Sequence, residues 1–105
     1  MAKSRLEMLE EFTRERPDDS FSHYGLAMEY LNAGRSEDAL ATFNKLLAFN
    51  PDYAAAYYHA GVLLGKLGRM PEARSILQRG IEVAGRNADF HTRSELEQAL
   101  HDLAR

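Results

Sequence analysis

The residues best suited to chemistry are two histidine–carboxylate pairs near the C-terminus, His91 with Glu95 and Glu97 with His101. On a helix, four-residue spacing puts both members of a pair on one face, so each pair offers two metal ligands. A catalytic metal centre needs a third protein ligand and an open coordination position. We therefore interpret these pairs as solvated side chains, and a weak metal site on the last helix is the alternative.

Other catalytic signatures are missing from the sequence. The chain has no cysteine, which excludes disulfides, thiolate metal sites and a cysteine nucleophile. It also has no glycine-rich phosphate loop and no recognisable nucleophile motif. His23 lies on an apolar stripe, where a packed or hydrogen-bonded core residue is expected rather than a general base. We predict a protein that is not an enzyme and that uses no cofactor.

Charge and hydropathy narrow the class of partner. The formal net charge of -3 is spread over interleaved residues of both signs, which indicates neither nucleic acid nor an anionic membrane as a partner. No stretch approaches the roughly 18 apolar residues of a membrane-spanning helix, and the N-terminus lacks the apolar run of a signal peptide. A chain of 105 residues is long enough to bury one core. We expect a single cytoplasmic domain, residues 1–105.

A 34-residue repeat organises the middle of the chain. Shifting the sequence by this period aligns five residues of similar type: Tyr57, Gly61, Gly68, Ala73 and Leu77 fall under His23, Ala27, Gly34, Ala39 and Phe43. A fixed period of this length is typical of a helical hairpin stacked on its copy. Gly34 and Gly68 suit the left-handed position just past a helix end, which glycine adopts most readily.

Six helices are expected to position these residues. Apolar residues at three- and four-residue steps predict a leading half-repeat helix over residues 3–16, which Pro17 stops. Repeat 1 covers 20–53, with Asp18, Asp19 and Ser20 as cap chemistry for a helix at about 21–33 and Ser36 as the cap of the next. Repeat 2 covers 54–87, with Asp52 as a possible cap, helices over 54–67 and 73–83, and Pro71 at a first helical position.

The last segment, residues 88–105, is predicted to form a C-terminal capping helix. Its apolar edge consists of Leu96, Leu100 and Leu103 on an otherwise polar helix. Thr92 with Glu95 is one possible capping box for its start, and a start at Asn87 is the other. Gly80, inside the preceding helix, costs about 1 kcal/mol relative to alanine. That cost suggests close packing against Gly80, and the C-terminal helix is the expected neighbour.

The pattern of the first repeat resembles that of the tetratricopeptide repeat family, which reads Trp-x2-Leu-Gly-x2-Tyr, Ala-x3-Phe and Pro in order. The corresponding residues are His23, Leu26, Ala27, Tyr30, Ala39, Phe43 and Pro51. The resemblance implies an all-α, right-handed superhelix of about six antiparallel helices that binds proteins. It also implies a concave groove lined by the first helix of each hairpin.

According to the resemblance, this groove is lined by an apolar strip, and its polar rim includes Asn32. The predicted contact residues are Phe21, Tyr24, Met28, Leu31, Tyr58, His59, Val62 and Lys66. The Lys and Asn positions with which family members clamp a C-terminal carboxylate correspond here to Tyr24, Met28 and His59, so an amphipathic helix fits better. Three occupants stay open: a partner peptide or protein, a second copy of the chain, and the leading or C-terminal helix itself.

Overall fold

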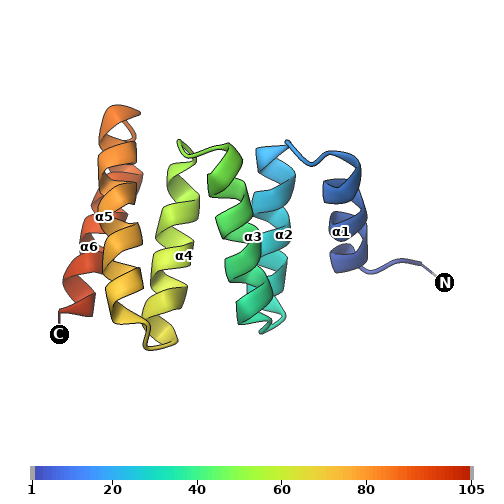
Figure 1. Cartoon of the computed structure of the whole chain (residues 1–105), viewed down its shortest axis with the longest axis horizontal. Coiled ribbons are helices and arrows are strands. Elements are labelled where there is room, and N and C mark those ends of the chain that lie inside the picture. Colours follow the sequence, from blue (N-terminus) through green and yellow to red (C-terminus); the bar gives the residue numbers. More distant parts are fainter. Residues whose placement is uncertain (1, 105) are drawn as a thin grey trace. The chain divides into compact units, whose positions relative to one another are not determined.

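The computed structural model describes residues 2–104, and within this range every regular element is a helix (Figure 1). The expected all-α class of about six helices is confirmed. The helices are α1 (Arg5–Glu15), α2 (Ser20–Asn32), α3 (Ser36–Phe49), α4 (Ala54–Lys66), α5 (Met70–Arg86) and α6 (Phe90–Leu103).

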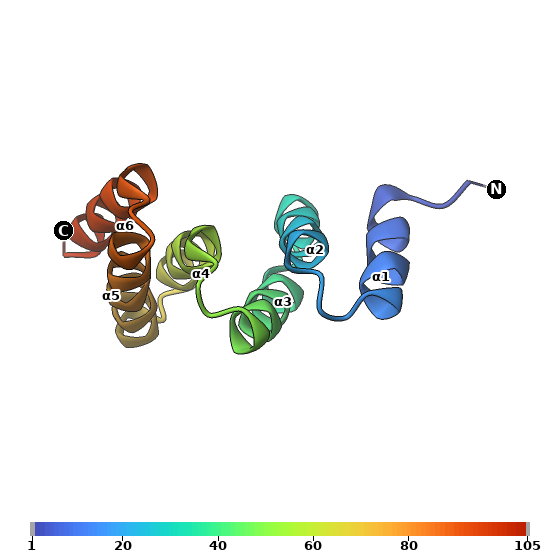
Figure 2. The ribbon, with the colours of Figure 1, turned by 90° about the horizontal axis from the view of Figure 1, so that it is seen from above.

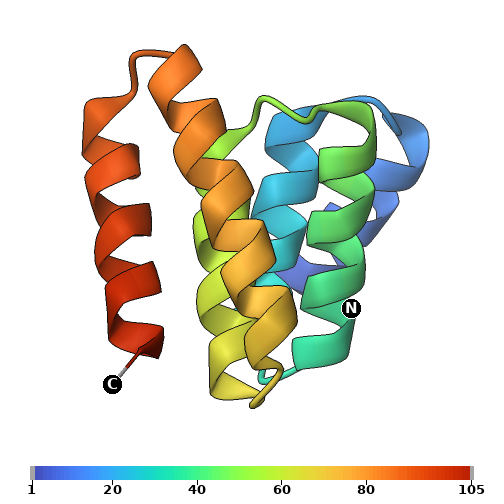
Figure 3. The same ribbon diagram turned by 60° about the vertical axis from the view of Figure 1, so that its left-hand side comes forward.

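Contacts group the helices into two compact units that divide between Asn50 and Pro51. In the first unit, α2 packs against both α1 and α3. In the second unit, α4, α5 and α6 each contact the other two, and Figures 2 and 3 show these three helices gathered around one another. The repeat limits drawn from the sequence stay a prediction.

The core of the first unit is built mainly by α2 and α3. Its buried side chains include Leu26, Ala27, Tyr30, Ala39, Leu40, Phe43 and Leu46. His23 is only 2% exposed, its Nδ1 lies 2.9 Å from the Asp19 carbonyl oxygen, and its ring meets Phe49 edge-on at 5.1 Å. The expectation that His23 is a packed core residue is therefore confirmed.

Polar contacts join α1 to α2. The Tyr30 hydroxyl donates to Glu10 Oε2 at 2.6 Å, and Arg5 Nε donates to Glu29 Oε2 at 2.9 Å. Burial raises the pKa of Tyr30 to about 12, and the hydrogen bond to Glu10 acts in the same direction. These bonds hold a helix whose own apolar residues Met8 and Phe12 stay exposed.

In the second unit, glycines let helices approach closely. A Cβ built on Gly80 of α5 would lie 2.5 Å from Tyr57 Cβ in α4 and 2.9 Å from Leu96 Cδ2 in α6. Leu96 is fully buried. The predicted contact between Gly80 and the C-terminal helix is confirmed, and α4 packs against the same glycine.

The length of α5 differs from the prediction of 73–83, because α5 runs from Met70 to Arg86. Both α1 and α3 end two residues before a proline, Pro17 or Pro51, because the residue before proline is driven out of helical conformation. One period after Pro51 the chain has Gly85. With no proline ring to stop it, α5 continues.

The turn between α5 and α6 has the same backbone hydrogen bond as the turns inside the two hairpins, where alone a tight turn was predicted. Asp89 N donates to the Ala84 carbonyl at 2.9 Å, as Arg35 N does to Tyr30 and Arg69 N to Leu64. In the hairpin turns the left-handed residue is Gly34 or Gly68, whereas here it is Ala88, with φ of 56°. Residues 87–89 therefore make a third tight turn, which carries α6 back along α5.

Several predicted cap positions were wrong. Neither proposed start of the last helix holds, because Asp89 caps α6 by accepting from Thr92 N at 3.2 Å. Ser36 is the first residue of α3 and not its cap, whereas Pro71 does lie at the start of α5, as expected. Tyr53, not Asp52, precedes α4. Asp52 instead pairs with Arg86 at 3.2 Å, and its carbonyl accepts from Asn87 at 2.9 Å, which ties the start of the second unit to the end of α5.

Candidate partner-binding groove

Helix α4 is apolar on two faces. One face is buried in the second unit through Tyr57, Ala60, Gly61 and Leu64. The other face carries Tyr58 and Val62, which are only partly covered. A four-residue step places Tyr58 and Val62 on the same side of the helix, one turn apart. This second apolar face forms one side of an open groove.

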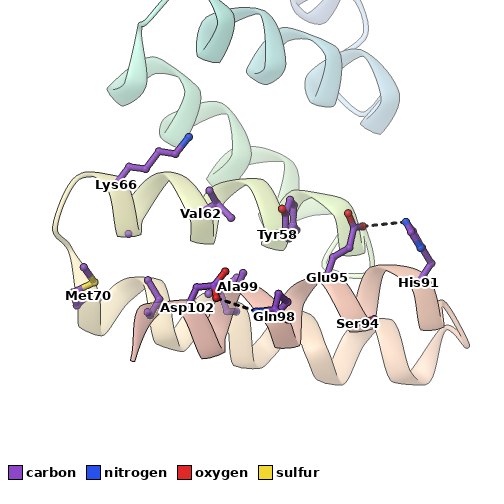
Figure 4. A pocket seen from close by; sticks show the side chains of 13 residues that line it. Tyr58, Val62, Lys66, Met70, His91, Ser94, Glu95, Gln98, Ala99 and Asp102 are labelled. Atoms are coloured by element: carbon purple, nitrogen blue, oxygen red, sulfur yellow. Dashed lines mark hydrogen bonds and ion pairs between the residues drawn. The ribbon is translucent and has the colours of Figure 1, made fainter. Parts of the chain in front are cut away.

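The groove has a volume of about 670 Å³ and lies among α4, α5 and α6. We call it the α4–α6 groove, and Figure 4 shows its lining side chains. They are Tyr58, Val62, Gly65 and Lys66 from α4, Met70 and Leu77 from α5, and His91, Ser94, Glu95, Gln98, Ala99, Asp102 and Leu103 from α6.

The α4 and α5 sides of the groove are mainly apolar, and one glycine determines how closely α6 approaches. A Cβ built on Gly65 would lie 2.8 Å from Leu103 Cδ2. Leu103 thus packs where a side chain at position 65 would otherwise stand, so α4 and α6 are in direct contact at this point. Lys66, which is exposed, adds a positive charge beside it.

The α6 side of the groove is polar and carries two carboxylates. Glu95 Oε1 lies 3.5 Å from His91 Nε2, and Gln98 Nε2 donates to Asp102 Oδ1 at 2.9 Å (Figure 4). Glu95 and Asp102 are seven residues apart on α6, which corresponds to two helical turns and a rise of about 10.5 Å. The groove therefore combines an apolar side with an acidic one.

His59 stands next to Tyr58 on α4 but is not among the residues that line the groove. Its ring meets the Tyr58 ring edge-on at 5.1 Å. Burial lowers the pKa of His59, and the nearby negative charge of Glu95 opposes that effect. Burial thus favours the neutral form of the imidazole in the folded protein.

The structure brings three of the predicted contact residues, Tyr58, Val62 and Lys66, into one groove. Four others belong to α2 in the first unit: Phe21, Tyr24, Met28 and Leu31, which we call the α2 stripe. Within the stripe Phe21 is 77% exposed, whereas Tyr24 is partly covered and meets Phe43 edge-on at 6.5 Å. The binding role of all eight residues stays a prediction.

The sequence analysis did not predict the acidic side of the groove, since it described the last helix only as a capping helix with one apolar edge. One signal was present: His91, Ser94, Glu95 and Gln98 stand one period after core positions of repeat 2 yet are polar. Helix α6 packs on α4 at Gly65 and leaves Tyr58 and Val62 partly exposed, so covering of the strip by the C-terminal helix stays a prediction.

The described residues offer no metal centre of the usual kind. Among residues 2–104, no group of three or more histidine and carboxylate side chains is placed to hold a metal ion. His91 and Glu95 do form a pair at the groove, but a third ligand is not at hand there. Over the same residues, no helix combines the length and the apolar character needed to cross a bilayer.

Comparisons with known proteins identify the fold family. The tetratricopeptide repeat family model matches residues 24–89, more than half of the chain. An uncharacterized protein of Methanocaldococcus jannaschii is 39% identical over 61 residues, which cover 58% of this chain and 71% of that protein.

Solved structures are similar over most of the chain. A tetratricopeptide repeat domain protein from Salinibacter ruber matches with a TM-score of 0.78 and 37% identity, covering 82% of this chain and 97% of that one. Protein BPP2914 from Bordetella parapertussis gives a TM-score of 0.84 and 26% identity, covering 99% and 90%. The chain belongs to the tetratricopeptide repeat family, whose members generally mediate protein–protein interaction and are typically non-catalytic.

Proposed function

We propose that this protein binds a protein partner by receiving an amphipathic helical segment in the α4–α6 groove. The observation that carries the proposal is the second apolar face of α4, where Tyr58 and Val62 remain partly uncovered beside a groove of about 670 Å³. A helix inside one folded unit normally buries its apolar residues on a single face. Leu103 covers this second face at Gly65, and the partly exposed Tyr58 and Val62 leave the rest of it for another molecule.

The lining of the groove supports a peptide ligand. Binding sites combine apolar walls with a few polar groups that orient the ligand. Tyr58 and Met70 supply partly exposed aromatic and flexible apolar surface, which favours anchoring side chains. A helix that lays apolar residues at positions i, i+3, i+4 and i+7 into a groove is a common mode of peptide recognition.

A display library of helical peptides, selected on the purified protein, tests the proposal. Val62→Asp puts a charge on the apolar side of the groove, and we expect it to weaken selected peptides at least about tenfold. Gln78→Asp, which adds the same charge at an exposed position of α5 outside the groove, is the control. Tyr58→Ser provides a second groove variant if Val62→Asp unfolds, as judged by circular dichroism.

The result against the proposal is specific. If folded Val62→Asp or Tyr58→Ser protein binds the selected peptides as tightly as Gln78→Asp protein does, the α4–α6 groove is not the binding site. The outcome does not depend on knowing the natural partner.

Self-association through the α2 stripe is the second candidate function. Its supporting observation is Phe21, whose side chain is 77% exposed at the start of α2. Large exposed aromatic residues are favoured anchors at interfaces, and a two-fold dimer uses the same surface patch on both copies. This candidate involves the first unit and is independent of the α4–α6 groove.

A further inference from the structure

We infer that the α4–α6 groove selects a cationic amphipathic helix, in which two basic side chains seven residues apart pair with Glu95 and Asp102. The inference rests on the proposed function, because it specifies the partner chemistry of the same groove. What it adds is the acidic side of the groove, contributed by α6.

The first argument is the spacing of the two carboxylates. Glu95 and Asp102 both line the groove and are separated by two turns of α6. A ligand helix lying along α6 repeats its side chains with the same rise per turn. Lysine or arginine at positions i and i+7 of that ligand therefore reaches both carboxylates at once.

The second argument is the hydrogen-bonding capacity of these groups. Within the described residues, Glu95 Oε1 lies 3.5 Å from His91 Nε2, and Asp102 Oδ1 accepts a hydrogen bond from Gln98 Nε2 at 2.9 Å. An ionised carboxylate accepts about four hydrogen bonds through its two oxygens. Both carboxylates thus retain acceptor capacity for an ammonium or guanidinium group.

The third argument is the balance of charge around the groove. Its lining contains two carboxylates, Glu95 and Asp102, and one ammonium group, that of Lys66 on the α4 side. The negative charges are confined to α6, opposite the apolar residues Tyr58 and Val62. An acidic ligand helix would meet like charges along that side, whereas a basic one meets opposite charges.

The fourth argument is the apolar surface between these charges. Tyr58, Val62 and Met70 are partly exposed apolar residues of the lining. If a ligand helix contacts this surface with its apolar residues at i+3 and i+4, its residues at i and i+7 lie on the same side of the ligand helix. The expected ligand therefore has a short apolar stripe with basic residues at its edge toward α6.

Two synthetic helical peptides with the same apolar stripe test the inference. One carries lysine at positions i and i+7, and the other carries glutamate there. Their dissociation constants are measured by calorimetry with wild-type protein, with the Glu95→Gln/Asp102→Asn double variant, and with Val62→Asp. The control is Glu82→Gln/Glu97→Gln, which removes two negative charges from exposed positions outside the groove.

We expect wild-type protein to bind the lysine peptide about tenfold more tightly than the glutamate peptide, with a preference that declines as salt rises. The preference should fall to about twofold or less in Glu95→Gln/Asp102→Asn and persist in the control variant. Val62→Asp should weaken the lysine peptide as well, because it disturbs the apolar side.

Failure of the inference and failure of the proposed function differ in outcome. Equal binding of both peptides to wild-type protein, or a preference that survives Glu95→Gln/Asp102→Asn, overturns the cationic selection. The proposed function stands in that case if Val62→Asp still weakens both peptides. If folded Val62→Asp protein binds the lysine peptide as tightly as wild-type protein does, both the inference and the proposed function are overturned. If wild-type protein binds neither peptide, the inference is overturned.

Discussion

Single residues determine how the repeat departs from its own period, and Ala88 is the clearest case. Pro17 and Pro51 end helices, whereas the equivalent position holds Gly85 and lets α5 continue to Arg86. The chain then turns at Ala88 with a positive φ of 56°, where a side chain is unfavourable. A tight turn follows, so that α6 begins at Phe90.

Replacing Ala88 by glycine should stabilise the protein by about 0.5–1 kcal/mol, because glycine adopts positive φ without steric cost. The free energy of unfolding from urea titration measures this effect. The same substitution at Ala48, which is exposed within α3, should destabilise by about 1 kcal/mol. Opposite signs for one chemical change isolate the backbone conformation as the cause, and equal signs would contradict it.

His59 makes stability depend on pH. Burial lowers its pKa below the ordinary value of 6.5, so the unfolded chain takes up a proton at a higher pH than the folded protein does. The free energy of unfolding should therefore fall as pH drops below about 6.5 and through the folded-state pKa.

Urea titrations at several pH values measure this dependence. His59→Gln should reduce its slope in that window, whereas His101→Gln, at an exposed position of α6, should leave it unchanged. An unchanged slope in His59→Gln would show that other groups cause the acid sensitivity.

At the scale of helices, small residues and polar contacts decide which elements can pack. Gly80 admits both Tyr57 and Leu96 onto α5, and Gly65 admits Leu103 onto α4. The acidic side of the groove is in place because these contacts seat α6. In the first unit, by contrast, α1 relies partly on hydrogen bonds between its residues Glu10 and Arg5 and the α2 residues Tyr30 and Glu29.

Gly80→Ala should destabilise the protein by about 1–3 kcal/mol, although alanine is the better helix former. The added Cβ would lie 2.5 Å from Tyr57 Cβ, which is bonded directly to the backbone and cannot turn away. Gly85→Ala is the matched control, since its nearest atom would be an arginine nitrogen 3.7 Å away. In thermal unfolding, the midpoint temperature of Gly85→Ala should lie above that of wild type, and the midpoint temperature of Gly80→Ala below it. The reverse order would refute close packing at Gly80.

Tyr30→Phe should loosen α1 by removing its hydrogen bond to Glu10, at a cost of about 1 kcal/mol. Hydrogen exchange is expected to accelerate in α1 and to stay unchanged in α6. Because the pKa of Tyr30 is raised to about 12, the unfolded chain ionises first as pH rises past 10, and stability is lost between these values. Tyr30→Phe should remove that alkaline loss, and an unaltered alkaline profile would argue against it.

At the scale of the molecule, two surfaces are proposed for binding, the α4–α6 groove and the α2 stripe. They lie in different units and predict different assemblies. The groove requires a ligand, whereas the stripe allows association between identical chains.

Light scattering over a concentration series separates these possibilities. If the α2 stripe forms a dimer, the average mass should approach twice the monomer mass as concentration rises, and Phe21→Ser should keep it monomeric. Ala41→Ser, at an exposed position of α3, is the control. A wild-type protein that stays monomeric at high micromolar concentration rules out the dimer.

The helices and much of the core could be predicted because their signals are local. Apolar residues at helical steps, the prolines at 17 and 51 and the glycines at 34 and 68 act on their own segments. The family pattern added which residues of α2 and α4 lie on their second apolar face. The caps were less predictable, since Asp52 instead binds the end of α5, 34 residues along the chain.

The sequence by itself determined the helical repeat, its period and the family, since these depend on residue types at fixed spacing along one chain. Only the tertiary structure decided that Asp89 caps α6, that Ala88 turns the chain, and that Leu103 packs on Gly65. These outcomes set the rotation of α6 and so place Glu95 and Asp102 at the groove. The physical reason is that the packing of one side of a helix determines which way its other side faces. The residues that pack there belong to other helices, so the sequence of one segment does not reveal them.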